Sequence, residues 1–231
     1  MKKFAIVLIA LFSIRSSYGQ ITIDGYGYGQ ILPGSFSIIN VSVSDGDILG
    51  GIRNVQTFAV SVFIDTPSAN QFLAFNNSGA SGSATLTYAG STGAFNGLGD
   101  VDLTQGGVNN CFSIDFTAAN NKGGSLTLTA ENIRFVGSTV TVPLPTSPGV
   151  LDIPFASFQI DSHVGDTQPV NFSDVGYIQE TLQMNNGESY TMSPLEESSV
   201  PEPSSALILI SGVFTAACLK KRTRLLPNFL R

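Results

Sequence analysis

Two pairs of aspartates are the first candidates for chemistry in this sequence. Asp45 and Asp47 form one pair, and Asp100 and Asp102 form the other. Residues two apart in an extended chain point to the same side, so each pair places two carboxylates on one face. Ca²⁺ is bound by clusters of oxygen ligands of this kind. The spacing therefore predicts a calcium site, and the alternative is a set of acidic turns without a bound ion.

Two tyrosines are the candidates for contact with a sugar. Tyr26 and Tyr28 alternate with glycine in the segment Gly25–Gly29, and the chain contains no tryptophan. Aromatic side chains offer a flat apolar face together with a polar tip, which suits a ligand that is itself amphipathic. The glycine-rich frame favours exposure of both rings, whereas ordinary packing within a β-structure is the alternative.

Catalytic constellations are scarce. The chain has one histidine, His163, and two cysteines, Cys111 and Cys218. The histidine count excludes a multi-histidine metal site, and a nucleophilic Cys111–His163 pair is the one thiol arrangement left open. Otherwise Cys111 is predicted to be a structural thiol at the start of a strand. A glycosidase needs two opposed carboxylates, but scattered acidic residues always contain such a pair, so this signal has no specificity.

The residues between the ends of the chain have the period of β-strands. From Val55 to Asp65, the apolar residues Phe58, Val60, Val62 and Ile64 alternate with smaller or polar ones, which predicts a half-buried strand. The same alternation occurs in four further segments: Ala84–Tyr88, Phe112–Phe116, Leu126–Ala130 and Val136–Val142. Clusters of Asn, Gly and Ser separate them and predict turns. We therefore expect an all-β protein, with a jelly-roll-like β-sandwich over residues 20–195.

Two later segments add to this architecture. Leu151–Phe158 is predicted to be a strand with Phe155 and Phe158 in the core, and Glu180–Met184 alternates again. Together with the intervening Asn171–Ile178, this order resembles the late strands of jelly-roll domains of the carbohydrate-binding-module type. The resemblance implies that the sandwich is a sugar-binding module.

Basic residues are concentrated at the two ends of the chain. Between Gln20 and Val200 there are three basic residues against 16 acidic ones, a formal balance of −13. Such a domain repels phosphate backbones, so a nucleic-acid partner is excluded. The first residues combine two lysines with the apolar run Phe4–Ile14, as in a secretory signal peptide. Small residues before Gln20 predict cleavage after Gly19, which assigns residues 1–19 to the signal.

The C-terminal end has three parts in a fixed order. The tetrapeptide Val200, Pro201, Glu202 and Pro203 is followed by an uncharged run, Ser205–Leu219, and then by the basic residues Lys220, Lys221, Arg222 and Arg224. A helix over the uncharged run would be ~22 Å long at ~1.5 Å per residue. A bilayer core is roughly 30 Å thick. The run is therefore a marginal membrane anchor, whose basic flank would stay in the cytoplasm.

This order resembles the PEP-CTERM sorting signal of Gram-negative bacteria. The resemblance implies that Val200, Pro201, Glu202 and Pro203 are recognised by an exosortase, a membrane-embedded protease, and that the basic cluster acts as a stop. It divides the end of the chain into a linker with the motif (196–204), a hydrophobic helix (205–219) and a basic cytoplasmic tail (220–231). The segment Asp47–Asn54 also resembles a pattern of exported PEP-CTERM proteins, with Arg53 as its matching residue.

Three functions of different classes follow from these features. The main prediction is an exported, non-catalytic surface or matrix protein, held transiently in the inner membrane, sorted by exosortase and associated with exopolysaccharide. The first alternative is a carbohydrate-binding, lectin-like module that uses Tyr26 and Tyr28. The second alternative is a secreted hydrolase. The calcium ion that the aspartate pairs predict is the one cofactor expected, and none of the three functions requires it.

Overall fold

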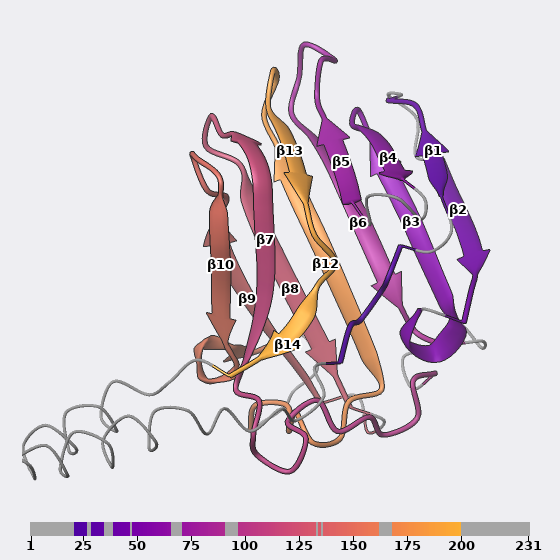
Figure 1. The fold of residues 1–231 in the computed structure, drawn as a ribbon, viewed down its shortest axis with the longest axis vertical. Coiled ribbons are helices and arrows are strands. Elements are labelled where there is room, and N and C mark those ends of the chain that lie inside the picture. Colours follow the sequence, from indigo (N-terminus) through magenta and orange to yellow (C-terminus); the bar gives the residue numbers. More distant parts are fainter. Residues whose placement is uncertain are drawn as a thin grey trace, which may run out of the picture. The chain divides into compact units, whose positions relative to one another are not determined.

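Short strands with alternating apolar residues form two stacked antiparallel sheets (Figure 1). The computed structural model describes residues 21–26, 29–34, 39–46, 48–65, 71–90, 97–132, 134, 136–161 and 168–199. Within these residues every regular element is a strand, apart from the short 3₁₀ turns η1 (Leu49–Gly51) and η2 (Phe155–Ser157). The protein is therefore a jelly-roll-like β-sandwich, as the alternation predicts.

Sheet I contains seven strands. They run in the order β1 (Gln30–Leu32), β4 (Ser61–Asp65), β5 (Gln71–Phe75), β13 (Ser189–Met192), β7 (Cys111–Asn120) and β10 (Gly149–Pro154), and β14 (Glu196–Ser198) also pairs with β7. In Figure 1 this sheet lies in front, with β10 at one side and β1 at the other.

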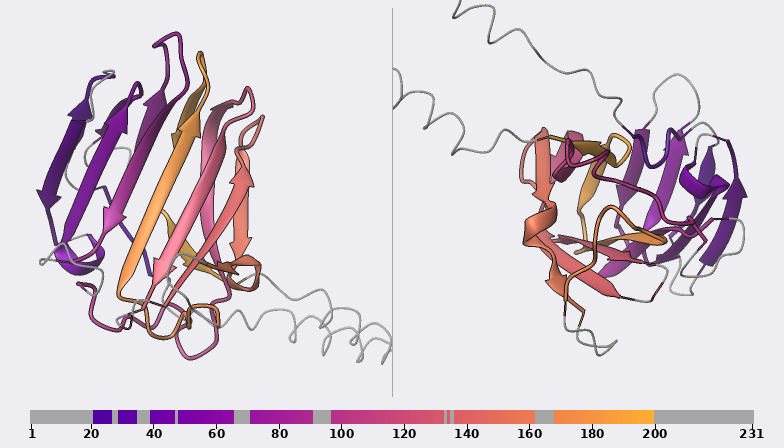
Figure 2. Two further views of the ribbon diagram at one scale, coloured as in Figure 1. Left: turned by 180° about the vertical axis from the view of Figure 1, so that it is seen from behind. Right: turned by 90° about the horizontal axis from the view of Figure 1, so that it is seen from below.

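Sheet II also contains seven strands and lies behind sheet I in Figure 1. Its order is β11 (Gln159–Ile160), β9 (Gly137–Pro143), β8 (Ser125–Glu131), β12 (Tyr177–Met184), β6 (Gly82–Tyr88), β3 (Ile52–Phe58) and β2 (Ile39–Ser44). Figure 2 shows that the two sheets are stacked face to face with their strands roughly aligned, so their outer faces point in opposite directions.

The core lies between the sheets and is filled by alternate residues of each strand. Strand β6 buries Ala84, Leu86 and Tyr88, and β8 buries Leu126, Leu128 and Ala130. Successive side chains of a strand point to opposite faces, so the residues between them face solvent. The predicted inward positions of β6, β7 and β8 are confirmed.

The predicted single strand from Val55 to Asp65 is wrong. The chain leaves sheet II at Phe58, the end of β3, and enters sheet I at Ser61, the start of β4. Ala59 has a φ of 58°, a left-handed conformation that turns the chain between the sheets. The turn reverses the phase of burial, so Phe58 is 38% exposed while Val60, Val62 and Ile64 are buried.

The predicted strand over Leu151–Phe158 ends earlier than expected. Strand β10 stops at Pro154, and Phe155–Ser157 forms the turn η2. The turn brings the half-buried Phe155 onto Phe172, with ring centroids 4.2 Å apart and nearly parallel planes. Phe158 is buried against the same ring at 5.0 Å, edge to face. Both phenylalanines therefore pack at the core, as predicted, although from a turn and its end.

The first and last described segments of the chain are hydrogen-bonded to each other. Ile23 N donates a hydrogen bond to Leu195 O at 2.9 Å, and Glu197 N donates one to Ile21 O at 3.1 Å. Strand β14 thus continues sheet I to Ser198, beyond the expected boundary at residue 195. The predicted signal peptide (1–19), Val200 and the predicted segments that follow it lie outside the described residues. None of the described helical turns is long and apolar enough to cross a membrane.

Candidate functional site

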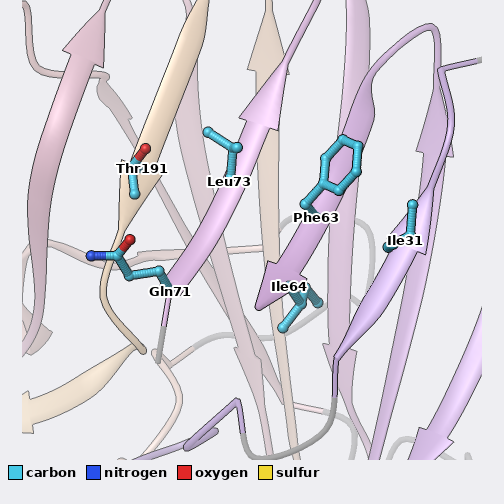
Figure 3. A pocket seen from close by; sticks show the side chains of 6 residues that line it. All are labelled: Ile31, Phe63, Ile64, Gln71, Leu73 and Thr191. Atoms are coloured by element: carbon cyan, nitrogen blue, oxygen red, sulfur yellow. The ribbon is translucent and has the colours of Figure 1, made fainter. Parts of the chain in front are cut away.

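An apolar groove crosses the outer face of sheet I. It has a volume of ≈ 370 Å³ and is lined by Ile31, Phe63, Ile64, Gln71, Leu73 and Thr191 (Figure 3). We refer to these six residues as the apolar groove. They come from β1, β4, β5 and β13, which are neighbours in the sheet.

Strand register explains why these side chains form one row. Ile31 is paired with Phe63, Phe63 with Leu73, and Leu73 with Thr191. Residues that are directly paired in antiparallel strands point to the same face. Neighbouring strands lie ~4.8 Å apart, so the row extends about 14 Å across the sheet. In Figure 3 the four side chains follow one another across the strands.

The floor of the groove is aromatic and partly solvent-exposed. Phe63 stacks on Phe75, with ring centroids 5.5 Å apart and an interplanar angle of 15°. Ile31 is 70% exposed and Leu73 is 36% exposed, which is unusual for large apolar side chains. The alternate residues of the same strands, Val62 and Phe72, are fully buried and hold the strands in place.

The polar groups of the groove are neutral. Gln71 contributes an amide and Thr191 a hydroxyl, and none of the six lining residues is titratable. An amide and a hydroxyl both donate and accept hydrogen bonds. An apolar floor with a few such groups can bind a neutral amphipathic ligand, but it offers neither an acid nor a nucleophile for catalysis.

Tyr26, the expected sugar contact, is buried. Its exposed fraction is 0%, its ring lies 6.2 Å from that of Phe72, and the guanidinium of Arg53 lies 5.6 Å from its centroid. The prediction that Tyr26 contacts a ligand is therefore wrong, because the glycine-rich segment packs into the core beside a buried cation. Tyr28 lies outside the described residues.

Arg53 is the centre of a buried polar network. Its Nη1 donates a hydrogen bond to Asp24 Oδ2 at 2.5 Å, and its Nε donates one to Gln30 Oε1 at 3.1 Å. Asp24 Oδ1 accepts a hydrogen bond from Tyr26 N at 2.8 Å. Burial raises the pKa of Asp24, while the charge of Arg53 acts in the opposite direction. Both side chains of the ion pair have zero exposure, so water does not screen their attraction.

Glu180 and Tyr88 are two further buried polar residues in the middle of sheet II. Tyr88 is paired with Arg53 in the sheet, and Glu180 lies on the next strand, β12. Both side chains are completely buried, and no described residue forms a hydrogen bond with the Glu180 carboxyl or the Tyr88 hydroxyl. Burial, and secondarily the charge of Asp24, raises the pKa of Glu180 to about 8. The protonated, neutral form of the carboxyl therefore predominates at pH 7.

The aspartate pairs are engaged in other contacts. Asp102 Oδ1 accepts hydrogen bonds from Thr104 Oγ1 at 2.6 Å and from Thr104 N at 2.9 Å, which lowers its pKa. A hydrogen bond with Asp174 raises the pKa of the exposed Asp100. Asp45 is described, but Asp47 is not. No three acidic, histidine or cysteine side chains among the described residues are grouped as metal ligands. The calcium site stays a prediction.

Cys111 is fully buried at the start of β7, and its Sγ donates a hydrogen bond to Ser198 O at 3.2 Å. This contact ties β14 to the sheet, which fits the predicted structural thiol. His163 lies outside the described residues, so the arrangement Cys111–His163 stays untested.

The residues of the apolar groove were missed in the sequence. A sequence pattern that could have indicated them is present in β4 and β5, because the runs Val62–Ile64 and Phe72–Phe75 are apolar at every position. A strand that is apolar on both sides indicates either burial of both faces or an exposed apolar face. In β4 only the alternate residues Val62 and Ile64 were predicted to face the core, and no strand was predicted over Phe72–Phe75.

Comparisons with known proteins find only distant structural similarity. No family model matches the chain, and no curated protein matches it. Among solved structures, the family 11 carbohydrate-binding module of the cellulase Lic26A-Cel5E of Clostridium thermocellum is 13% identical, with a TM-score of 0.40, and the match covers 80% of this chain and 97% of that one.

Two further structures match in a similar way. TmCBM61 in complex with β-1,4-galactotriose is 13% identical (TM-score 0.35, covering 64% of this chain and 88% of that one). The agarase AgWH50C is 9% identical (TM-score 0.41), and the match covers 64% of this chain but 24% of the agarase. Similarity at this level establishes neither a shared family nor a shared ligand.

The buried ion pair yields the first prediction. Asp24→Ala leaves the Arg53 cation buried without its carboxylate, so we expect the free energy of unfolding to fall by about 3–5 kcal/mol in urea denaturation. Asp115→Ala, at an exposed position of β7, is the matched control, with an expected change within about 0.5 kcal/mol.

A double variant separates the interaction between Asp24 and Arg53 from the effects of losing either side chain alone. Asp24→Ala combined with Arg53→Met removes both charges and leaves neither unpaired. We expect it to be more stable than the sum of the two single changes implies, by at least about 1 kcal/mol. Strict additivity of the two changes would contradict a coupled ion pair.

Glu180 yields a prediction for pH dependence. Its folded-state pKa of about 8 exceeds the ordinary value of 4.5, so the folded state binds the proton more tightly than the unfolded state. The contribution of this proton to the free energy of unfolding is therefore complete below pH 4.5. It is lost as the pH rises to 8, at about 1.4 kcal/mol per pH unit. Glu180→Gln should flatten this slope in urea denaturation between pH 5 and 8. Equal slopes for both proteins would show that Glu180 is ionised in the fold.

Proposed function

We propose that the sandwich is a non-catalytic module that binds a neutral polysaccharide in the apolar groove of sheet I. The observation that carries the proposal is the row of Ile31, Phe63, Leu73 and Thr191, an exposed apolar floor with hydrogen-bonding groups beside it. A pyranose ring has apolar faces and hydroxyl edges, so it matches a floor of this composition. An open groove about 14 Å long across the strands suits a chain rather than a compact molecule.

Charge restricts the class of polymer. The residues from Gln20 to Val200 carry a formal balance of −13, and anionic polymers are repelled by such a field. None of the six described residues that line the groove carries a charge that would attract a cationic polymer. An uncharged polysaccharide is the ligand that both features favour.

We also propose that the chain reaches the cell exterior through its two ends. The signal-peptide features of residues 1–19 and the PEP-CTERM order of Val200–Arg224 support this proposal. In this view the hydrophobic run holds the protein in the inner membrane until an exosortase cuts near Pro201–Pro203. The released sandwich then binds exopolysaccharide at the cell surface or in the matrix.

The groove gives a prediction for binding. Phe63→Ala removes the central ring of the floor, and we expect the affinity for a neutral polysaccharide to fall at least tenfold, about 1.4 kcal/mol. Isothermal titration with soluble mixed-linkage β-1,3-1,4-glucan, β-1,4-galactan and agarose fragments measures the change.

Two variants control this experiment. Phe63→Tyr keeps the ring and should bind like the natural protein. Val150→Ala truncates an exposed apolar residue on β10, at the opposite edge of the same sheet, and should leave the affinity unchanged. Absence of binding to every polysaccharide, or equal loss in Phe63→Ala and Val150→Ala, would refute a sugar site in the groove.

Mass spectrometry of the mature protein from its own host tests the export proposal. We expect an N-terminus near Gln20 and a C-terminus within or just before Pro201–Pro203. An intact C-terminal Arg231 would contradict processing by an exosortase.

A further inference from the structure

The outer face of sheet II carries two rows of neutral hydroxyl and amide side chains. The first row follows the register of five neighbouring strands from β3 to β9, and its members are Gln56, Thr85, Thr181, Thr127 and Thr141. All five are at least partly exposed. Because they are paired across the strands, the five side chains lie on one face.

The second row lies two residues further along the same strands. Its members are Asn54, Thr87, Gln179, Thr129 and Thr139, which are again paired in sequence across the sheet and partly exposed. We call the two rows together the threonine–glutamine face. Its side chains repeat every ~4.8 Å across the strands and every ~6.8 Å along them, over about 19 Å.

The side chains of this face are held in place by one another. Thr85 Oγ1 and Thr181 Oγ1 lie 3.1 Å apart, and Thr127 Oγ1 and Thr141 Oγ1 lie 2.9 Å apart. A hydroxyl has one donor and two acceptor positions, so each such pair keeps one donor and several acceptors for another molecule. Threonine is also stiff at χ1. Binding a rigid partner would therefore cost little side-chain entropy.

The composition of the face excludes several classes of partner. It has no lysine or arginine, which nucleic acids and anionic lipids require. Its two rows contain no aromatic or large aliphatic side chain to anchor a protein interface. Phe58, 38% exposed, and the largely buried Tyr177 lie beyond the two rows on the same strands. It also has no carboxylate, although the domain is strongly acidic. What remains is a partner that is uncharged, rich in hydroxyls and regular in two dimensions.

We propose that the threonine–glutamine face binds the ordered surface of an insoluble, uncharged polysaccharide. The proposal rests on the proposed function for the class of ligand, but it uses the opposite sheet. The outer faces of the two sheets point away from each other (Figure 2). One molecule can then hold a soluble chain in the apolar groove and a solid surface on sheet II, and so cross-link the two.

Sedimentation with microcrystalline cellulose tests this proposal on the exported protein. Thr181→Lys places a long charged side chain in the centre of the face, and we expect the partition onto cellulose to fall at least tenfold. Thr127→Ser keeps a hydroxyl and should retain binding within about twofold. Thr146→Lys makes the same charge change at an exposed position between β9 and β10, and should also retain it.

Two measurements distinguish the outcomes. Thermal unfolding of Thr181→Lys should stay within a few degrees of the natural protein, because the position faces solvent. Phe63→Ala should lose soluble glycan and still sediment with cellulose. Sedimentation that is lost in Phe63→Ala but kept in Thr181→Lys would overturn the second surface and leave the groove intact. A natural protein that fails to sediment would overturn it as well, and intact titration of soluble glycan would then show that the proposed function survives.

Discussion

The buried pair of Arg53 and Asp24 is the interaction on which the arrangement of the two sheets depends at one edge. Arg53 belongs to β3 of sheet II, while its second partner, Gln30, belongs to β1 of sheet I. Asp24 lies in the segment before β1 and is bridged to Ile48, just before η1. A buried cation needs its hydrogen-bond partners, because leaving one unpaired in the core is strongly unfavourable. Arg53 therefore holds three segments in a fixed relation.

The apolar groove is a consequence of this constraint. Strand β1 has only three residues and pairs with a single neighbour, β4, so it needs further support. Gln30 provides this support from the buried side, through Arg53 Nε at 3.1 Å and Val41 O at 3.4 Å. The next residue, Ile31, then points outward beside Phe63. A charge in the core thus positions an exposed apolar wall on the surface.

Much of the fold could be predicted from local periodicity, because β6 and β8 bury every second residue and β7 does so from Phe112 to Phe116. Periodicity failed where the chain changes sheets, at Ala59, because a single left-handed residue shifts the phase without changing the composition. It also failed at Tyr26, whose burial depends on Arg53, a residue 27 positions away. The groove was not predicted because Phe63 and Leu73 are apolar residues that face solvent. A run that is apolar at every position does not show which of its residues face the core.

The distribution of charge links the two proposed surfaces. Of the three basic residues between Gln20 and Val200, Arg53 is buried. Its charge is paired with Asp24 and does not offset the acidic surface. The acidic side chains of Asp102, Asp115 and Asp152 are exposed elsewhere on the sandwich. The apolar groove and the threonine–glutamine face are neutral patches within this acidic surface. Repulsion then keeps identical domains apart, whereas an uncharged polymer can approach either patch without losing electrostatic energy. The acidity that repels nucleic acid is thus compatible with the neutral polysaccharide that we propose as the ligand of both surfaces.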